Sequence, residues 1–259
     1  MIDNYSLTNL AKTAGIDRYT VLREYLQIIF LDKLYQAKPA KKIIFKGGTA
    51  LRMLHGSPRF SEDLDFNTQL SGPEINQLVN HAIVTLQKNE APGINVKTVK
   101  SLTGITKKIF FPTDITPMPL TIRLDFSRRE ASSTKLQTTI TTNLPVFPGS
   151  LIQSLSLEEI LAEKLRAILT RNKGRDIFDL WFLLKKGVNF DKKLIFQKLK
   201  IYGGKFHPKT LPEKIKTINQ PQLSQDVKKF LPLKNRSVVL HLKNLTLTAL
   251  SQSNFSQIF

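Results

Sequence analysis

Residues 42–66 read KIIFKGGTALRMLHGSPRFSEDLDF, and this stretch decides the fold of the chain. Its opening Lys-Ile-Ile-Phe has the character of a short strand, and two glycines then form a turn. Helix-forming residues follow over 49–55, with Thr49 as a candidate N-cap, and the Gly-Ser-Pro at 56–58 ends the helix. The stretch therefore predicts a strand, a tight turn and a short helix ahead of an acidic segment.

The acidic segment contains Asp63 and Asp65, which alternate with Leu64 and Phe66. A period of two is typical of a half-buried strand and places both carboxylates on one face. Two like charges side by side repel each other and are costly to desolvate, and a bound cation relieves both effects. Carboxylate oxygens are the ligands that Mg²⁺ prefers, usually together with substrate phosphates. The pattern favours a metal site, and the alternative is an exposed acidic strand end after a tight turn.

The two glycines that precede the helix, Gly47 and Gly48, favour a phosphate site. Glycine lets a backbone approach a phosphate closely, and a helix N-terminus directs its N–H groups at an anion. The whole stretch is therefore typical of half a triphosphate site joined to half a metal site.

A glycine pair, a short helix and then D-x-D resemble the signature of the polymerase-β-like nucleotidyltransferases. The fuller pattern K-G-G-T-A-L-R…R-x-S-x-D-L-D-F is similar to the AbiEii family, the nucleotidyltransferase toxins of bacterial toxin–antitoxin and phage-defence systems, to which the MenT toxins are related. The matching residues are Lys46, Gly47, Gly48, Thr49, Ala50, Leu51, Arg52, Arg59, Ser61, Asp63, Leu64, Asp65 and Phe66.

Composition sets the class of protein. The chain has 259 residues, 41% of them hydrophobic, with no apolar run long enough to cross a bilayer, no signal-peptide pattern and no cysteine. These features fit a bacterial cytoplasmic protein. The net charge of +19 and the pI near 10.1 favour a polyanionic partner, with nucleic acid first and an acidic protein or a membrane surface next.

The rest of the chain falls into two parts. Residues 1–40 are expected to be mostly helical, with Ser6 as a candidate cap, and residues 74–88 form an amphipathic helix. Residues 94–150 are rich in Thr, Ile, Val and Phe and predict several strands, whereas the chain returns to helix from about residue 155. We therefore predict an α+β protein with a nucleotidyltransferase core over 1–150 and a helical, basic domain over 151–259 that completes the active site.

A third carboxylate lies in the predicted strand TIRLDFS, residues 121–127, where Asp125 alternates with apolar residues. In the polymerase-β-like fold a third acidic residue on a neighbouring strand commonly helps to activate the attacking hydroxyl. The resemblance therefore makes Asp125 a candidate metal ligand. The alternative is a surface ion pair between Asp125 and either Arg123 or Arg128.

A lysine interrupts the apolar face of the helix predicted at 157–170. Lys164 lies three residues after Leu161, so its side chain must reach out to solvent, pair with an acid or reach into a site. Asp176 and Asp179 follow in the next helix, where both can be ordinary acids near a helix N-terminus.

This region also resembles the AbiEii family, whose later motifs read approximately E-x-x-A-E-K-L-x-A and R-D-x-x-D-L. The matching residues are Glu159, Ala162, Glu163, Lys164, Leu165, Ala167, Arg175, Asp176, Asp179 and Leu180. The essential lysine of the family maps to Lys164, which implies contact with the nucleotide phosphates. The later essential aspartate maps to Asp176, with Asp179 as the other possibility.

Together the resemblances imply metal-dependent transfer of a nucleotide from an NTP. Mg²⁺ or Mn²⁺ is held by Asp63 and Asp65, with Asp125 as the candidate third ligand. Nucleotide-binding residues are Lys46, Gly47, Gly48, Thr49, Ser61 and Lys164, and Asp176 orients Lys164 or the acceptor.

The implied acceptor is RNA, with the 3′ end of tRNA as the expected site, so that addition blocks translation. A toxin of this kind implies a cognate antitoxin. Ten lysines over 192–229 are a candidate RNA surface, with Tyr202 and Phe206 as stacking groups. Two alternatives stay open: transfer onto a protein, and a protein that binds nucleic acid without catalysis.

Overall fold

The computed structural model describes residues 2–99, 104–115, 117–130, 134–201, 203 and 207–258, except for the side chain of Asn89. The described chain divides into two compact units. The first comprises Met1–Gly56 and Phe60–Ser154, and the second comprises Ser57–Arg59 and Leu155–Phe259. The sequence indicated a boundary near residue 150 but gave no sign that Ser57–Arg59 belong with the second unit.

The first unit is built on a mixed seven-stranded sheet with the order β3-β4-β5-β2-β1-β7-β6. The strands are β1 (Ile43–Lys46), β2 (Asp63–Thr68), β3 (Asn95–Val99), β4 (Gly104–Phe111), β5 (Leu120–Ser127), β6 (Leu136–Thr138) and β7 (Ile152–Ser154). The pairs β2–β5 and β1–β7 are parallel, and the other neighbours are antiparallel. The predicted α+β class is confirmed.

Stacked phenylalanines fix the register of the three central strands. Phe45 of β1 lies opposite Phe66 of β2, which lies opposite Phe126 of β5, with ring centroids 5.5 Å and 4.9 Å apart. All three side chains are buried. Because side chains alternate between the faces of a strand, burial of this stack sends the neighbouring positions, Asp65 among them, to the opposite face.

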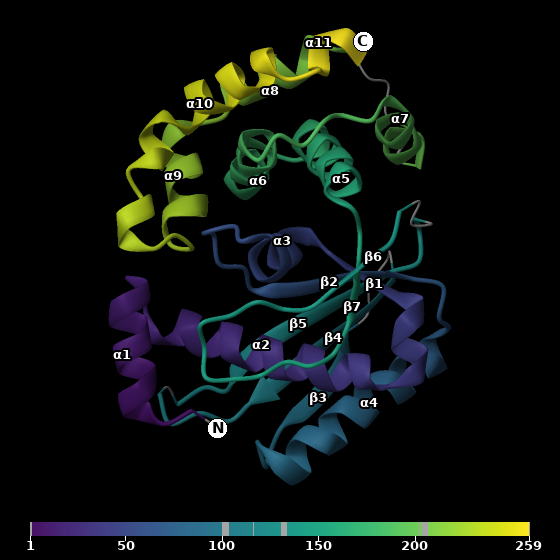
Figure 1. Ribbon diagram of the computed structural model, residues 1–259, viewed down its shortest axis with the longest axis vertical. Helices are drawn as coiled ribbons and strands as arrows, with labels where there is room; N and C mark the ends of the chain where they lie inside the picture. The colour runs from purple at the N-terminus through teal and green to yellow at the C-terminus, as the bar shows by residue number, and fades with distance from the viewer. Residues whose placement is uncertain are drawn as a thin grey trace. The chain divides into compact units, whose positions relative to one another are not determined.

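The helices of the first unit are α1 (Asn4–Ala14), α2 (Arg18–Gln36), η1 (Lys38–Lys42), α3 (Gly47–His55) and α4 (Gly72–Asn89). Helix α2 packs on β5 and on α4, as Figure 1 shows, while α3 packs on β1 and β2. The predicted cap of α1 was wrong: Asp3 is the N-cap, and its carboxylate accepts a hydrogen bond of 2.8 Å from the backbone N–H of Ser6.

The start of α3 also differs from the prediction. The glycines do not form a separate turn but lie in the first turn of the helix, which begins at Gly47 with Lys46 as its N-cap. Thr49 does not cap the helix, because its hydroxyl donates to the backbone carbonyl of Asp63 instead. This hydrogen bond ties α3 to the start of β2.

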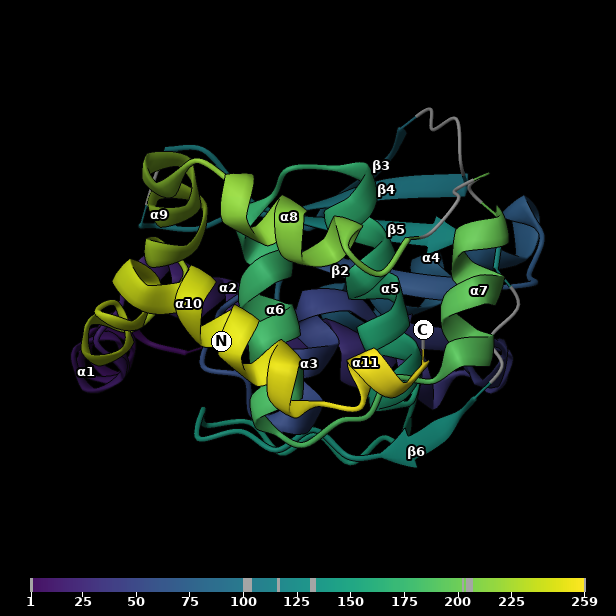
Figure 2. The same cartoon turned by 90° about the horizontal axis from the view of Figure 1, so that it is seen from above.

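The second unit is helical. It contains α5 (Leu157–Thr170), α6 (Gly174–Lys185), α7 (Lys192–Ile201), α8 (Thr210–Thr217), α9 (Gln220–Lys228), η2 (Leu233–Asn235), α10 (Val238–Gln252) and α11 (Phe255–Ile258). Helix α5 contacts α6, α7 and α8, while α10 and α9 pack on α6 (Figure 2). Among the described residues, no helix combines the length and the hydropathy that a membrane span needs.

Two close contacts hold this helical unit together. The amine of Lys198 on α7 lies 2.8 Å from Glu159 and 3.2 Å from Glu163 of α5, and all three side chains are buried. At the start of α6, a Cβ on Gly174 would lie 2.9 Å from a methyl carbon and 3.0 Å from the Cα of Leu223, so a larger residue would force α9 to shift. Both features lie on α5 and α6, the helices that carry the predicted site residues Lys164, Asp176 and Asp179.

Candidate active site

The predicted metal-binding carboxylates lie on two adjacent strands of the first unit. Asp63 and Asp65 alternate with buried residues on β2, and Asp65 is in register with Asp125 on the parallel strand β5. In-register residues of parallel strands point to the same face of a sheet. Lys46 of β1 lies opposite Asp65 on the other side. The structure therefore brings Lys46, Asp65 and Asp125 to neighbouring positions on three strands.

Asp125 is held by an arginine on its own strand. The Nε of Arg123 lies 2.7 Å from Oδ2 of Asp125, and Nη2 lies 3.1 Å from Oδ1. The hydroxyl of Thr106 on β4 also donates to Oδ1. Hydrogen bonding to Asp125 raises the pKa of Arg123, and the charges of Asp125, Asp63 and Asp65 add to this effect. The predicted Asp125–Arg123 ion pair is thus present. The same guanidinium interacts electrostatically with Asp63 and Asp65 as well.

These carboxylates suit a hard divalent cation. They supply only oxygen donors, which Mg²⁺ and Mn²⁺ accept, and a positive group already lies among them. In the described part of the chain, however, no three His, Cys, Asp or Glu side chains are arranged around a common metal position. Both carboxylate oxygens of Asp125 contact the guanidinium of Arg123 in this structure.

The backbone at Gly47 approaches Asp65 closely. Gly47 has a φ of +79°, a conformation that L-residues rarely adopt, and a Cβ there would lie 2.5 Å from Oδ2 of Asp65. A side chain at this position would therefore displace the carboxylate. The sequence indicated glycine for approach to a phosphate, and the structure gives a second reason, the space that Asp65 occupies.

Replacing Gly47 with alanine is expected to lower the free energy of unfolding by about 1–2 kcal/mol, the cost of a left-handed backbone for an L-residue. It should also reduce nucleotidyl transfer, because Asp65 moves. Urea unfolding and a transfer assay measure the two effects. The matched control is Gly149→Ala, where an added Cβ meets no atom within 4 Å. Equal behaviour of the two variants would show that the position of Asp65 does not depend on Gly47.

The second cluster lies within the second unit and is buried. The Nζ of Lys164 on α5 is 2.7 Å from Oδ2 of Asp179 and 3.3 Å from Oδ1 of Asp176, both on α6. Only 9% of Lys164 is exposed, so its side chain does not reach out to solvent. Of the three possibilities that the sequence left open, pairing with an acid is the one observed. Both Asp176 and Asp179 take part.

Two arginines complete this cluster. Arg59 forms a bidentate pair with Asp179, with two N–O distances of 2.8 Å, and both side chains are almost fully buried. Arg171 binds Asp176 through distances of 2.8 Å and 3.0 Å from a more exposed position. Arg59 matches the family motif, but nothing in the sequence indicated its partner Asp179, which is 120 residues away in the chain.

The charges of the cluster stabilise one another. Burial alone opposes a charge on Lys164, but Asp179 and Asp176 outweigh it and raise the pKa of Lys164. Burial likewise opposes a charge on Asp176, yet Lys164 and Arg171 lower the pKa of Asp176 to about 2. The pKa of Asp179 is also lowered, because Arg59 and Lys164 overcome the effect of burial. Lys164 therefore carries its positive charge in the interior.

Acid should weaken this cluster. The pKa of Asp176 falls from 3.8 to about 2 on folding, so its contribution is complete above pH 3.8 and is lost as the pH falls towards 2. The expected loss is on the order of 2 kcal/mol of unfolding free energy. Urea unfolding at pH 5 and at lower pH should show a smaller acid-dependent loss for Asp176→Asn than for the unmodified protein. Identical losses would contradict the assigned role of Asp176.

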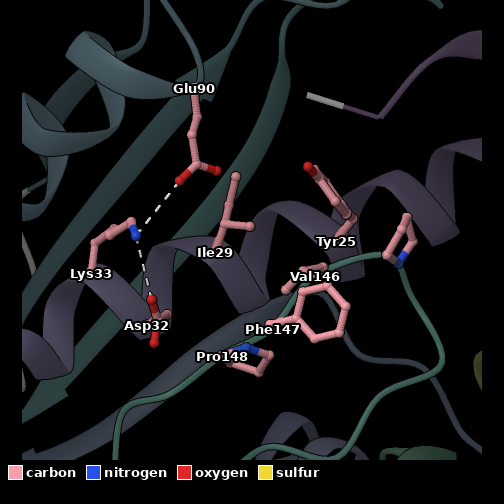
Figure 3. Close-up of a pocket in the computed structure, with 9 residues that line it drawn as sticks. Tyr25, Ile29, Asp32, Lys33, Glu90, Val146, Phe147 and Pro148 are labelled. Carbon is pink, nitrogen blue, oxygen red and sulfur yellow. Dashed lines mark hydrogen bonds and ion pairs between the residues drawn. The ribbon is translucent and has the colours of Figure 1, made fainter.

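A pocket elsewhere in the first unit contains a different charge cluster. Its volume is about 180 Å³, and Figure 3 shows Lys33 between Asp32 and Glu90 on its wall. The carboxylate of Asp32 also accepts hydrogen bonds from the backbone N–H groups of Gly149 and Ser150 at 3.1 Å and 3.0 Å. Asp32 therefore anchors the segment after β6 on α2, which is a structural role.

Comparison with known proteins agrees with this architecture. Three solved structures share the fold: JHP933 from Helicobacter pylori, a putative nucleotidyltransferase from H. pylori, and MenT4, a nucleotidyltransferase toxin from Mycobacterium tuberculosis. Their TM-scores are 0.56, 0.59 and 0.60, with sequence identities of 21%, 21% and 17%. The alignments cover 93%, 94% and 96% of this chain and 96%, 99% and 99% of the other chains.

Comparison with curated proteins gave no match. A family model does match: the nucleotidyl transferase AbiEii toxin of type IV toxin–antitoxin systems, over residues 29–237. That range includes both clusters described above. The chain therefore belongs to the AbiEii family of nucleotidyltransferase toxins.

Proposed function

We propose that this nucleotidyltransferase transfers a nucleotide from an NTP to RNA, at the 3′ end of a tRNA, with Mg²⁺ or Mn²⁺ as cofactor. The observation that carries the proposal is the placement of Asp63, Asp65 and Asp125 on one face of two paired strands. Charge supports an RNA acceptor, because residues 155–259 contain 20 Lys and Arg against 8 Asp and Glu. The expected stacking groups Tyr202 and Phe206 lie outside the described residues.

The reaction forms one bond and breaks one. A hydroxyl oxygen of the RNA end bonds to the α-phosphorus, the bond from that phosphorus to the bridging oxygen breaks, and pyrophosphate leaves. The hydroxyl proton passes to a base, for which Asp125 is the candidate. A divalent cation held by Asp63 and Asp65 supplies the charge that stabilises the phosphates during transfer.

The remaining predicted residues bind and orient the nucleotide. Gly47 and Gly48 carry the first backbone N–H groups of α3, where a phosphate is favoured. Lys46 of β1 lies opposite Asp65, and Ser61 lies two residues before Asp63 in the sequence. Thr49 contributes indirectly, since its side chain ties α3 to β2.

Lys164 is suited to a phosphate contact despite its burial. An ammonium group has three N–H donors, and the two ion pairs described for Lys164 leave a donor for a phosphate oxygen. Asp176 and Asp179 then orient the amine. We propose that this cluster and the carboxylates of β2 and β5 are both required for transfer.

Biologically, addition to tRNA would block translation in the cytoplasm. A cognate antitoxin would counter this effect, and the proposed setting is defence against phage. The membership of a type IV toxin–antitoxin family supports this part of the proposal.

The test is a labelling assay with purified protein, Mg²⁺, total bacterial RNA and each α-labelled NTP in turn. Transfer of label to a tRNA-sized band supports the proposal and names the base. Label on protein instead would show that the acceptor is a protein. Nucleotide and RNA binding without any transfer, across all four NTPs and with Mn²⁺ as well, would favour a binding protein without catalysis.

A further inference from the structure

Among the described residues of β5, Arg123 is the arginine on the face that carries the carboxylates. It is in register with Asp63 on β2 and two residues before Asp125 on its own strand, so it shares a face with all three carboxylates. The guanidinium thus lies where the carboxylates need a positive charge.

Arg123 and a metal at Asp125 would compete for the same carboxylate. Nε and Nη2 of Arg123 bind the two different oxygens of Asp125, at 2.7 Å and 3.1 Å. Thr106 donates to one of the same oxygens. A divalent cation at Oδ1 would need a lone pair that Arg123 or Thr106 now uses, and at either oxygen it would meet the repulsion of the adjacent guanidinium.

The pair is also easy to break. The side chain of Arg123 is 47% exposed and that of Asp125 is 30% exposed. Exposed ion pairs contribute little to stability, so separating this one costs little. Arg59 offers the contrast within the same chain: its side chain is 3% exposed and its pair with Asp179 is fixed in the interior.

We propose that Arg123 is a built-in counter-ion of the carboxylate cluster, which holds Asp125 in the metal-free protein and leaves it when a divalent cation binds. The inference rests on the proposed metal role of these aspartates. Arg123 acts here as a positioning residue, because it keeps the three carboxylates together without metal. The positive charge of Arg123 lowers the affinity for the cation, because the cation has to displace the guanidinium from Asp125.

The experiment measures binding of Mn²⁺ by the loss of its free electron-paramagnetic-resonance signal, without nucleotide. Arg123→Ala is expected to bind Mn²⁺ about tenfold more tightly than the unmodified protein, because one adjacent positive charge is gone. Arg123→Lys keeps that charge and should bind less tightly than Arg123→Ala. Lys108→Ala, which removes a cation in register with Arg123 on β4, is the matched control and should change the affinity less.

Thermal unfolding gives a second readout. In EDTA, Arg123→Ala should unfold at a lower temperature than the unmodified protein, because the carboxylates lose an adjacent positive charge. Added Mn²⁺ should then raise its midpoint by more than it raises that of the unmodified protein. Equal gains for both proteins, or weaker Mn²⁺ binding by Arg123→Ala, would overturn the inference.

The outcomes separate this inference from the proposed function. If Asp65→Ala abolishes Mn²⁺ binding while Arg123→Ala leaves it unchanged, the metal site stands and the counter-ion role falls. If neither the unmodified protein nor Arg123→Ala binds Mn²⁺, both the counter-ion role and the metal role of the aspartates fall.

Discussion

Replacing Asp65 with alanine is expected to reduce nucleotidyl transfer by about 10³-fold or more, since removing charge stabilisation at a reacting phosphate is usually the largest single loss. Asp65 lies at the centre of its cluster, in register with Lys46 on one side and Asp125 on the other. Its carboxylate also lies against Gly47. The fold should survive, because the substitution removes one of several repelling charges from a partly exposed position.

The matched control for this variant is Glu62→Ala. Glu62 precedes Asp63 in the sequence but pairs with Arg23 of α2 at 2.9 Å. The control therefore removes one carboxylate from the same segment without touching the predicted metal ligands, and it should retain most of the activity. Label incorporation and a circular dichroism spectrum are measured for each protein. If the Asp65→Ala protein kept its activity, the proposed role of Asp65 as a metal ligand would be wrong.

Replacing Asp179 with alanine is expected to lower the free energy of unfolding by about 3–5 kcal/mol, the usual cost of leaving a buried charge without its partner. Asp179 is fully buried. Its carboxylate accepts hydrogen bonds from Nε and Nη2 of Arg59 and forms an ion pair with the amine of Lys164. Its loss leaves two interior cations with insufficient negative charge. Destabilisation on this scale is a large part of the stability of an ordinary domain.

Urea unfolding measures this effect, with Asp191→Ala as the control in the same unit. Asp191 is exposed and caps α7 through a 2.9 Å hydrogen bond from the backbone N–H of Leu194. Its removal should cost about 1 kcal/mol, as expected for an N-cap. If both variants lost a similar amount, the ion pair of Asp179 and Arg59 would contribute no more than a surface contact.

Much of the sheet could be predicted because its signal is local. Alternation of Asp63 and Asp65 with Leu64 and Phe66 predicted both β2 and the face that carries the acids, and the structure agrees. The same reasoning applied to Asp125 on β5. Capping was harder: Ser6 and Thr49 were chosen by residue type, whereas Asp3 caps α1 and α3 begins at Gly47 without a side-chain cap.

The contacts of the two clusters could not be read from local pattern. Arg59 and Asp179 are far apart in the chain, and nothing in the spacing of either residue indicates the other. The pairing of Arg123 with Asp125 was one of several open possibilities, and its bidentate geometry depends on rotamers that a sequence does not specify. The roles of the individual site residues in catalysis remain predictions for the assays above.

The assignment of Ser57–Arg59 to the helical unit has a consequence for gene engineering and for evolution. The polypeptide enters the helical unit at residue 57, returns to the sheet unit at residue 60 and enters the helical unit again at residue 155. A gene fragment that encodes only residues 155–259 lacks Arg59, so its product would bury Asp179 without the guanidinium that pairs with it. The helical unit is therefore not encoded by one continuous stretch of the gene, and a fragment that begins at residue 155 would lack the buried partner of Asp179.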